Sequence, residues 1–226
     1  MAHLFFDLDG TLLDPSEGFT LSLAHAFSSS GLVAPPREAL VTAIGPPADE
    51  WSAHFGEKVL PSAALPELIF HYREHYEREG LYRQKHYPGL RESLDALLSA
   101  GHSLSVATSK PQKQAETVLS HFGLEPLFSG RIFGRDLSQS GDKTTILGRG
   151  LRLSEHAPER SIMIGDRMHD GIAARNLGLT SLGVLYGFGS REELESAGVT
   201  VICQLPQEIP TCVALILQRF TSLTSA

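Results

Sequence analysis

The stretch that decides the fold is HLFFDLDGTLLDP, residues 3–15, in which apolar residues run directly into two aspartates. Residues 3–8 have the character of a buried strand, but Asp7 and Asp9 are poor strand formers and are costly to bury without partners. Alternate residues of an extended chain point to the same side, so both carboxylates face one way. Gly10 then permits a tight turn. We therefore expect two acids presented together at the end of a buried strand.

The composition narrows the class of protein. The chain has 226 residues, 42% hydrophobic and 20% charged, with a net charge of −7, which suits one large domain or two unequal ones. The acidic balance argues against a nucleic-acid partner, and the longest apolar runs are far too short for a membrane span. The first residues lack the features of a secretory signal, and Cys203 and Cys212 match neither a zinc pattern nor a disulfide framework. We therefore expect a cytoplasmic protein with reduced thiols, and neither a nucleic-acid nor a membrane partner.

The segment after the opening stretch is predicted to be helical. Apolar residues recur at helical spacing, and prolines stand near the first turn of two of the expected helices, where a helix tolerates them. The helices are expected over residues 16–30, 36–44, 47–55 and 63–79. Residues 15–84 contain no convincing strand, and Pro46–Pro47 are expected to stiffen a turn.

The pattern changes after residue 85, where short apolar runs alternate with helical segments. Strands are expected at 102–109, 130–134, 161–166, 180–187 and 200–203. Helices are expected at 89–100, 111–121, 142–151, 167–177, 190–197 and 206–219. Strands that alternate with helices predict an α/β fold, a parallel sheet covered on both faces. Ligands bind such sheets outside the carboxyl ends of the strands.

Acids, hydroxyls and lysines stand at these predicted strand ends and at one helix start. They are Asp7, Asp9, Thr108, Ser109, Lys110, Lys143, Asp166 and Asp170. Carboxylates within a few ångströms of one another repel, and a hard divalent cation such as Mg²⁺, which prefers oxygen ligands, removes that repulsion. A lysine and hydroxyls beside helix starts suit a phosphate dianion. The combination predicts Mg²⁺ with a phosphorylated ligand, and nucleophilic phosphoryl transfer by a carboxylate.

Simpler interpretations compete with this one. If Asp7 opened a calcium-binding loop, Leu12 would stand where that loop needs glycine and Gly18 where it needs glutamate. Asp7 and Asp9 could also merely cap a turn, as aspartate often does. A lysine at a helix start, as Lys143 is expected to be, is unfavourable unless an anion lies near. Lys110 is the competing candidate for the lysine of the site.

Four motifs resemble those of the haloacid dehalogenase-like hydrolases, in the same order and at similar spacing. They are FFDLDGTLLD, VATSK, Lys143 and MIGDRMHD. The chain looks most like the phosphoglycolate phosphatase-like branch of that family. The resemblance implies a Rossmann-like three-layer core, residues 1–14 and 85–226, with an inserted all-helical cap domain, residues 15–84.

The resemblance also implies roles for the catalytic residues. Asp7 corresponds to the nucleophile that forms an aspartyl-phosphate, and Asp9 to the general acid that later acts as the base. Lys143 corresponds to the lysine that neutralises developing charge. Because Asp7 and Asp9 are two residues apart, one strand end can present the nucleophile and the acid together.

The binding residues follow from the same resemblance. Gly10, Thr108 and Ser109 are expected to hold the phosphoryl group together with Asp7 and Lys143. The Asp7 carboxylate, the main-chain carbonyl of Asp9 and Asp166 are expected to bind Mg²⁺. Asp170 is expected to orient that shell rather than to bind the ion directly.

The predicted function is Mg²⁺-dependent hydrolysis of a small phosphomonoester, as in phosphoglycolate phosphatases. A sugar phosphomutase, a nucleotidase and a non-catalytic regulatory protein remain alternatives. Phosphonate hydrolysis would need a cap lysine, and Lys58 is the only lysine between residues 14 and 84. The expected partner is a small phosphorylated metabolite, and the protein is expected to be a monomer or a homodimer.

Overall fold

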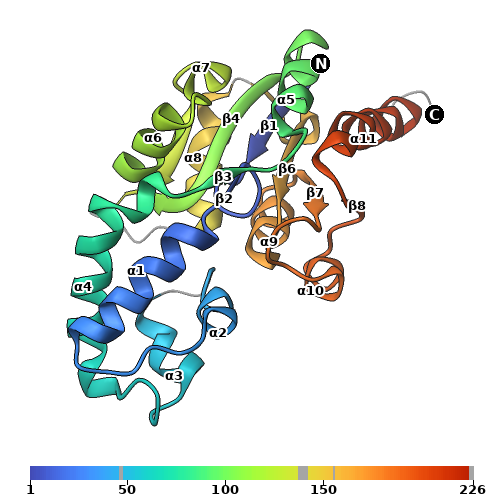
Figure 1. The fold of residues 1–226 in the computed structure, drawn as a ribbon. Coiled ribbons are helices and arrows are strands. Elements are labelled where there is room, and N and C mark those ends of the chain that lie inside the picture. Colours follow the sequence, from blue (N-terminus) through green and yellow to red (C-terminus); the bar gives the residue numbers. More distant parts are fainter. Residues whose placement is uncertain (46–47, 137–141, 155, 224–226) are drawn as a thin grey trace. The chain divides into compact units, whose positions relative to one another are not determined.

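The computed structural model describes residues 1–226 except 46–47, 137–141, 155 and 224–226 (Figure 1). The turn expected at Pro46–Pro47 lies outside the described residues. The chain divides into two compact units, one made of Met1–Asp14 with His86–Ala226 and the other of Pro15–Lys85.

The first unit is built on a six-stranded parallel sheet with the order β5-β4-β1-β6-β7-β8. Its strands are β1 (His3–Phe6), β4 (Ser103–Pro111), β5 (Ile132–Arg135), β6 (Ser161–Gly165), β7 (Thr180–Val184) and β8 (Val201–Cys203). Strand β1 lies between β4 and β6, with Phe6 paired with Val106 and Ile164. The carboxyl ends of these three strands therefore meet at one edge, which confirms the predicted α/β fold with a parallel sheet.

Helices cover both faces of this sheet (Figure 1). They are α5 (Leu90–Ser99), α6 (Gln112–His121), α7 (Glu125–Phe128), α8 (Lys143–Leu153), α9 (Met168–Asn176), α10 (Arg191–Ser196) and α11 (Ile209–Leu223). On one face Phe5 and Met163 pack with Ile146 and Leu147 of α8 and Ala173 of α9. On the other face the ring of Phe6 meets that of Phe128 in α7 edge-on. Strand residues alternate between the two buried layers, because successive side chains point to opposite faces.

Several predicted strand boundaries are wrong, and three of them matter for the site. The strand expected over 3–8 ends at Phe6, so Asp7 and Asp9 lie beyond it. The strand expected over 102–109 runs on to Pro111, and its pairing with β5 is irregular between Ala107 and Pro111. The strand expected over 180–187 ends at Val184 instead. Apolar runs that contain glycine have the pattern of a strand, so the turn after Val184 leaves little trace in the sequence.

The second unit is helical. Its helices are α1 (Ser16–Ser29), α2 (Arg37–Val41), α3 (Trp51–Phe55) and α4 (Leu65–Arg78), and its described residues before Lys85 contain no strand. Trp51 is buried and its ring packs edge-on against Phe19 of α1 and Tyr72 of α4. These aromatic contacts join three helices of the unit into one small core. A two-stranded sheet, β2 (Leu13–Asp14) with β3 (Lys85–His86), marks the chain segments where the units join.

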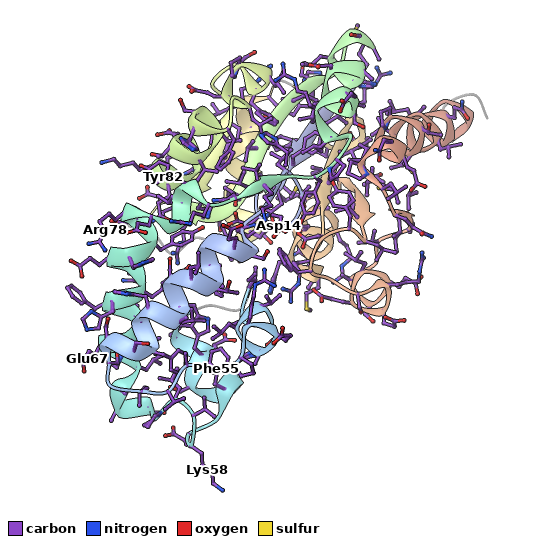
Figure 2. All side chains as sticks on the ribbon, viewed as in Figure 1. Asp14, Phe55, Lys58, Glu67, Arg78 and Tyr82 are labelled. Atoms are coloured by element: carbon purple, nitrogen blue, oxygen red, sulfur yellow. The ribbon has the colours of Figure 1, made fainter. Side chains whose placement is uncertain are left out.

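Lys58 is exposed on the segment between α3 and α4 (Figure 2). A lysine that forms a Schiff base needs an apolar pocket that lowers the pKa of its amine, and an exposed side chain has none. Lys58 therefore does not suit the phosphonate hydrolysis considered above.

Within the described part of the chain, no helix has the length and apolar character needed to cross a membrane.

Candidate active site

Three carboxylates meet at the carboxyl edge of the sheet. Asp7 directly follows β1, its backbone N–H donates to Ile164 at 2.9 Å, and Asp166 directly follows β6. Asp170 lies in the first turn of α9, and one carboxylate oxygen from each of the three aspartates lies within 4.8 Å of the others. Asp166 and Asp170 are almost fully buried. The structure thus brings together three of the four residues expected to surround the metal.

Lys143 joins this group from the start of α8. Asp142 caps that helix, because its Oδ1 accepts the backbone N–H of Thr145 at 2.7 Å. The Nζ atom of Lys143 lies 2.7 Å from Asp7 Oδ1 and 2.8 Å from Asp170 Oδ1, and the side chain is buried. A lysine at a helix start is unfavourable unless an anion lies near it, and here Asp7 and Asp170 are those anions.

Asp9 has a different partner. Its Oδ2 lies 2.8 Å from the Nζ atom of Lys110, which is buried near the end of β4. Asp9 Oδ1 is buried and accepts no hydrogen bond from the residues that the structure describes. The two candidate lysines are thus divided between the two candidate carboxylates, with Lys143 beside Asp7 and Lys110 beside Asp9.

The hydroxyl residues lie within β4, because that strand continues past its predicted end. Thr108 is buried and its Oγ1 accepts the backbone N–H of Lys110 at 3.2 Å, whereas Ser109 is exposed. The irregular pairing over this stretch resembles a bulge, a feature that often re-aims side chains beside active sites. The role of these two residues in phosphate binding stays a prediction.

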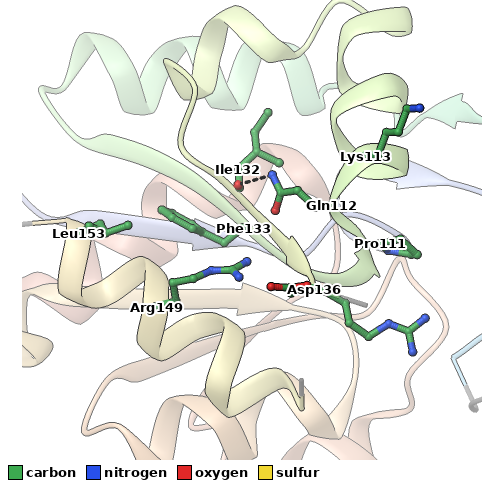
Figure 3. A pocket seen from close by; sticks show the side chains of 9 residues that line it. Pro111, Gln112, Lys113, Ile132, Phe133, Asp136, Arg149 and Leu153 are labelled. Atoms are coloured by element: carbon green, nitrogen blue, oxygen red, sulfur yellow. Dashed lines mark hydrogen bonds between the residues drawn. The ribbon is translucent and has the colours of Figure 1, made fainter. Parts of the chain in front are cut away.

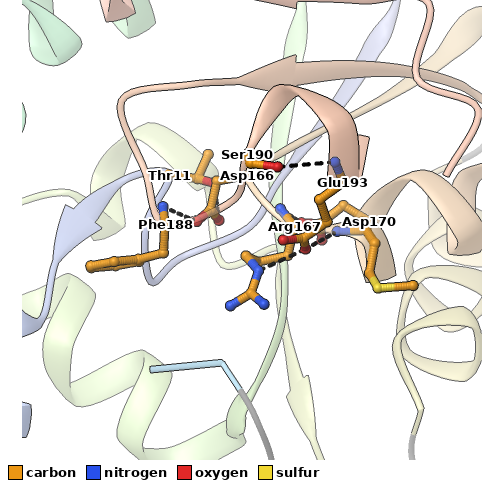
Figure 4. A network of polar contacts seen from close by, with 8 residues as sticks. Thr11, Asp166, Arg167, Asp170, Phe188, Ser190 and Glu193 are labelled. Atoms are coloured by element: carbon orange, nitrogen blue, oxygen red, sulfur yellow. Dashed lines mark hydrogen bonds and ion pairs between the residues drawn. The ribbon is translucent and has the colours of Figure 1, made fainter. Parts of the chain in front are cut away.

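Two donors that the sequence analysis missed hold Asp166 in place. Asp166 Oδ1 accepts the hydroxyl of Thr11 at 3.2 Å, and Oδ2 accepts the backbone N–H of Phe188 at 2.8 Å (Figure 4). Gly10, which has φ of +85°, lies against the same carboxylate, since a Cβ there would be 2.2 Å from Asp166 Oδ2. The glycines around Phe188 in YGFGS were the available sequence signal, because they permit close backbone approach.

Burial and mutual repulsion shift the pKa values of the acids. Burial, together with Asp7 and Asp170, raises the pKa of Asp166 to about 8. Burial also raises the pKa of Asp170 to about 6, although Lys143 opposes the rise. Burial by itself would lower the pKa of Lys143, but Asp170 and Asp7 outweigh it and raise that pKa, so the amine stays charged. Burial raises the pKa of Asp9 against the opposing effect of Lys110.

These features fit a hard divalent cation. The three carboxylates lie close together and Lys143 contacts only Asp7 and Asp170 among them, so the cluster lacks positive charge when all three acids are ionised. Burial and, after it, repulsion from the neighbouring aspartates raise the pKa values of Asp166 and Asp170, and a bound cation would oppose both effects. Oxygen donors at this spacing are the ligands that Mg²⁺ takes in proteins. The acidic cluster of Asp7, Asp166 and Asp170 could therefore hold a metal ion.

The raised pKa of Asp166 predicts how the metal-free protein responds to pH. Its folded-state pKa of about 8 lies above the ordinary 3.8, so the folded state binds this proton more tightly than the unfolded state. Its contribution to stability is therefore lost as pH rises towards 8. His3, whose pKa is lowered to about 4 by burial, acts in the opposite direction only below its ordinary 6.5. In EDTA we expect the thermal midpoint to fall above about pH 6.5, and Mg²⁺ to raise it most near pH 8.

The measurement is thermal unfolding in EDTA and in Mg²⁺ across this pH range, with Asp166→Asn as the matched variant. That substitution removes the titrating carboxyl and should flatten the slope in EDTA. A slope that is the same in both proteins would show that Asp166 does not titrate there.

A cavity of about 540 Å³ lies beside β5 (Figure 3), and the residues that line it include no member of the acidic cluster. Gln112 Nε2 donates to the carbonyl of Ile132 at 2.9 Å, and Gln112 Oε1 accepts from Gly134 N at 2.6 Å. Arg149 donates to the carbonyl of Gly134. These side chains satisfy backbone groups of an edge strand, which would otherwise be open to pairing with another chain. None of the predicted site residues lines this cavity.

The family follows from comparison with known proteins. The family model described as haloacid dehalogenase-like hydrolase matches residues 4–184, which include the strand ends and the acidic cluster. The chain belongs to this family. The resemblance seen in the four motifs is thereby confirmed.

Relatives within the family carry different names. The chain is 39% identical over 203 residues to a 5′-nucleotidase of Pseudomonas aeruginosa, covering 89% of this chain and 90% of the relative. It is 33% identical over 199 residues to the tyrosine-protein kinase PtkA of Mycobacterium tuberculosis, covering 88% and 67%. It is 34% identical over 187 residues to a phosphoglycolate phosphatase of Agrobacterium fabrum, covering 81% and 80%.

A solved structure supports the fold as well. A haloacid dehalogenase-like family protein from Streptococcus pneumoniae matches with a TM-score of 0.84 and 27% identity. The match covers 93% of this chain and 97% of that protein.

Proposed function

We propose that this protein is a Mg²⁺-dependent phosphatase that hydrolyses a small phosphomonoester through an aspartyl-phosphate intermediate, an acyl phosphate formed on Asp7. The observation that carries the proposal is the cluster of Asp7, Asp166 and Asp170, in which Lys143 contacts Asp7 and Asp170. Family membership and relatives named as a nucleotidase and a phosphatase support it.

The chemistry assigned to Asp7 and Asp9 takes two steps. In the first step an Asp7 carboxylate oxygen bonds to phosphorus, the bond to the substrate's ester oxygen breaks, and Asp9 gives that oxygen a proton. In the second step Asp9 takes a proton from water, whose oxygen bonds to phosphorus and releases Asp7. The raised pKa of Asp9 favours the protonated form that the first step needs. Lys143 offsets the repulsion between the Asp7 carboxylate and the phosphate.

The metal and phosphate sites complete the assignment. Asp7, Asp166 and the main-chain carbonyl of Asp9 would hold Mg²⁺, with Asp170 orienting that group through Lys143. When bound, Mg²⁺ supplies positive charge that stabilises the transferring phosphoryl oxygens. Gly10, Thr108 and Ser109 are proposed to bind that group, and Pro15–Lys85 is proposed to act as the cap.

Removal of the metal tests the proposal. We expect phosphate release from an aryl phosphate in Mg²⁺, and a loss of at least about 10²-fold in EDTA, because a bound metal supplies several kcal/mol of stabilisation. Restored Mg²⁺ should restore the rate. Equal rates with and without EDTA would contradict a metal-dependent mechanism.

A panel of substrates shows which of the activities named for the relatives this protein shares. Nucleoside 5′-monophosphates and 2-phosphoglycolate are assayed beside a sugar phosphate and a tyrosine-containing peptide with ATP, and both released phosphate and phosphopeptide are measured. The proposal expects release to water from one of the first two classes. Transfer to the sugar or to tyrosine faster than release to water would replace hydrolysis by phosphoryl transfer to another acceptor.

A further inference from the structure

The segment Leu185–Ser190 connects β7 to α10 and crosses the Asp166 side of the acidic cluster (Figure 4). We name it the Asp166 strap. Both of its ends are tied down within the same unit. At its start, the Tyr186 hydroxyl donates to the carbonyl of Thr11 at 2.9 Å. At its end, Ser190 Oγ accepts the backbone N–H of Glu193 at 3.1 Å and so caps α10.

The α10 end of the strap is also joined to the chain that follows Asp166. Glu193 Oε1 accepts from Arg167 Nε and from the backbone N–H of Met168, both at 2.8 Å. Arg167 directly follows Asp166 in the sequence. The strap therefore holds the turn after β1 through Thr11, and helix α10, which the strap leads into, holds the turn after β6 through Arg167.

The middle of the strap touches the carboxylate itself. The backbone N–H of Phe188 donates to Asp166 Oδ2 at 2.8 Å, while Thr11 donates to Oδ1. A carboxylate held by one donor on each oxygen has a single orientation, which is the function of groups that support metal ligands.

Glycine at two strap positions is required by space. A Cβ on Gly187 would lie 2.3 Å from the Gly10 carbonyl and 2.4 Å from the Asp166 Cβ, and one on Gly189 would lie 1.8 Å from the Asp166 carbonyl. Real Cβ atoms do not approach other atoms so closely, so any side chain here must displace the strap, Asp166 or the turn at Gly10.

We propose that the Asp166 strap is a positioning element that sets the orientation of the Asp166 carboxylate toward the metal ion, with Gly187 and Tyr186 as its key residues. The proposal rests on the proposed function, because it takes Asp166 as a metal ligand. The strap acts through Asp166 and carries no reacting group itself.

The test measures metal affinity directly, by electron paramagnetic resonance of Mn²⁺ as the probe in the absence of substrate. Gly187→Ala is expected to weaken Mn²⁺ binding at least about tenfold, the usual scale for groups that orient metal ligands. Tyr186→Phe removes one hydroxyl and keeps the ring, and is expected to weaken binding about fivefold, as for the loss of one hydrogen bond. Raising the Mg²⁺ concentration is expected to restore much of the phosphatase rate of both variants.

Gly148→Ala is the matched control, because a Cβ there would make only ordinary contacts, 3.5 Å from Leu177 in the helix-packed interior. It should bind Mn²⁺ within about twofold of the parent. The proposal is overturned if Gly187→Ala, when folded, and Tyr186→Phe both bind Mn²⁺ as tightly as the parent.

A further variant separates the two proposals. If Asp166→Asn loses Mn²⁺ while both strap variants retain it, the metal site stands and the strap proposal alone fails. If Asp166→Asn binds Mn²⁺ as tightly as the parent, the metal assignment fails and the strap proposal falls with it.

Discussion

Asp7→Asn should lower phosphatase activity by at least about 10⁴-fold, the scale on which enzymes lose activity when a catalytic nucleophile is removed. The amide has nearly the shape of the carboxylate, but it lacks the charge and the basic oxygen needed to bond to phosphorus. The side chain follows β1 directly and touches Lys143, so the substitution changes chemistry at a position fixed by the sheet.

The same variant should remain well folded, which separates a chemical effect from a structural one. Asp7 is one of three carboxylates that lie close together, and Lys143 retains its contact with Asp170 at 2.8 Å. Removing one negative charge relieves repulsion, so the thermal midpoint in EDTA should stay level or rise. Stability gained together with activity lost is typical of a functional charge cluster.

Steady-state rates on an aryl phosphate and thermal unfolding in EDTA provide the two measurements. Asp95→Asn is the matched control, since Asp95 is exposed on α5 and pairs only locally with Arg91. It should change neither quantity. An Asp7→Asn protein that keeps full activity would falsify the assignment of Asp7 as nucleophile.

The sheet and the acidic cluster could be predicted from the sequence because the cause of each is local. A buried strand that ends in Asp7 identifies itself by composition, and alternating strands and helices imply parallel strands whose carboxyl ends meet. The spacing of Asp166 and Asp170 then places both near Asp7, as the structure has them. The family motif and the physical argument agree on Asp7 because both concern the short turn that follows β1.

Neither the strap nor the pairing of each lysine with its aspartate could be predicted in the same way. Residues 180–187 have the pattern of a strand, and only the position of Asp166 in three dimensions explains why the chain turns after Val184. Lys110 and Lys143 both stood at suitable positions, and spacing alone could not assign either to a particular aspartate. Such pairings depend on which strands become neighbours and where helix α8 begins, which are tertiary features.

Lys143→Met should lower activity by on the order of 10³-fold, because Lys143 supplies preorganised charge beside the nucleophile. Its ammonium contacts Asp7 at 2.7 Å and Asp170 at 2.8 Å with little exposure to solvent. Loss of one partner from a buried ion pair also destabilises a protein by about 3 kcal/mol, since the remaining charge stays buried without compensation. We expect this destabilisation in EDTA and a smaller one in Mg²⁺, because the metal ion restores positive charge to the acids.

The pH dependence strengthens this test. The two carboxylates raise the pKa of Lys143, so the amine stays charged across the neutral range and the effect of its removal on activity should persist from pH 6 to about pH 9. Rates and urea unfolding of Lys143→Met are compared with those of Lys113→Met, which replaces an exposed lysine of α6 and should match the parent.

Lys110→Met decides between the two lysines. Lys110 contacts Asp9, so its removal should further raise the pKa of the Asp9 carboxyl and shift the pH profile of the rate upward. Lys143→Met should instead lower the rate across the whole profile, because it removes the charge that contacts the nucleophile, while its effect on the pKa of Asp9 is smaller than that of Lys110. If Lys110→Met gave the uniform loss and Lys143→Met the shifted profile, the roles assigned to the two lysines would have to be exchanged.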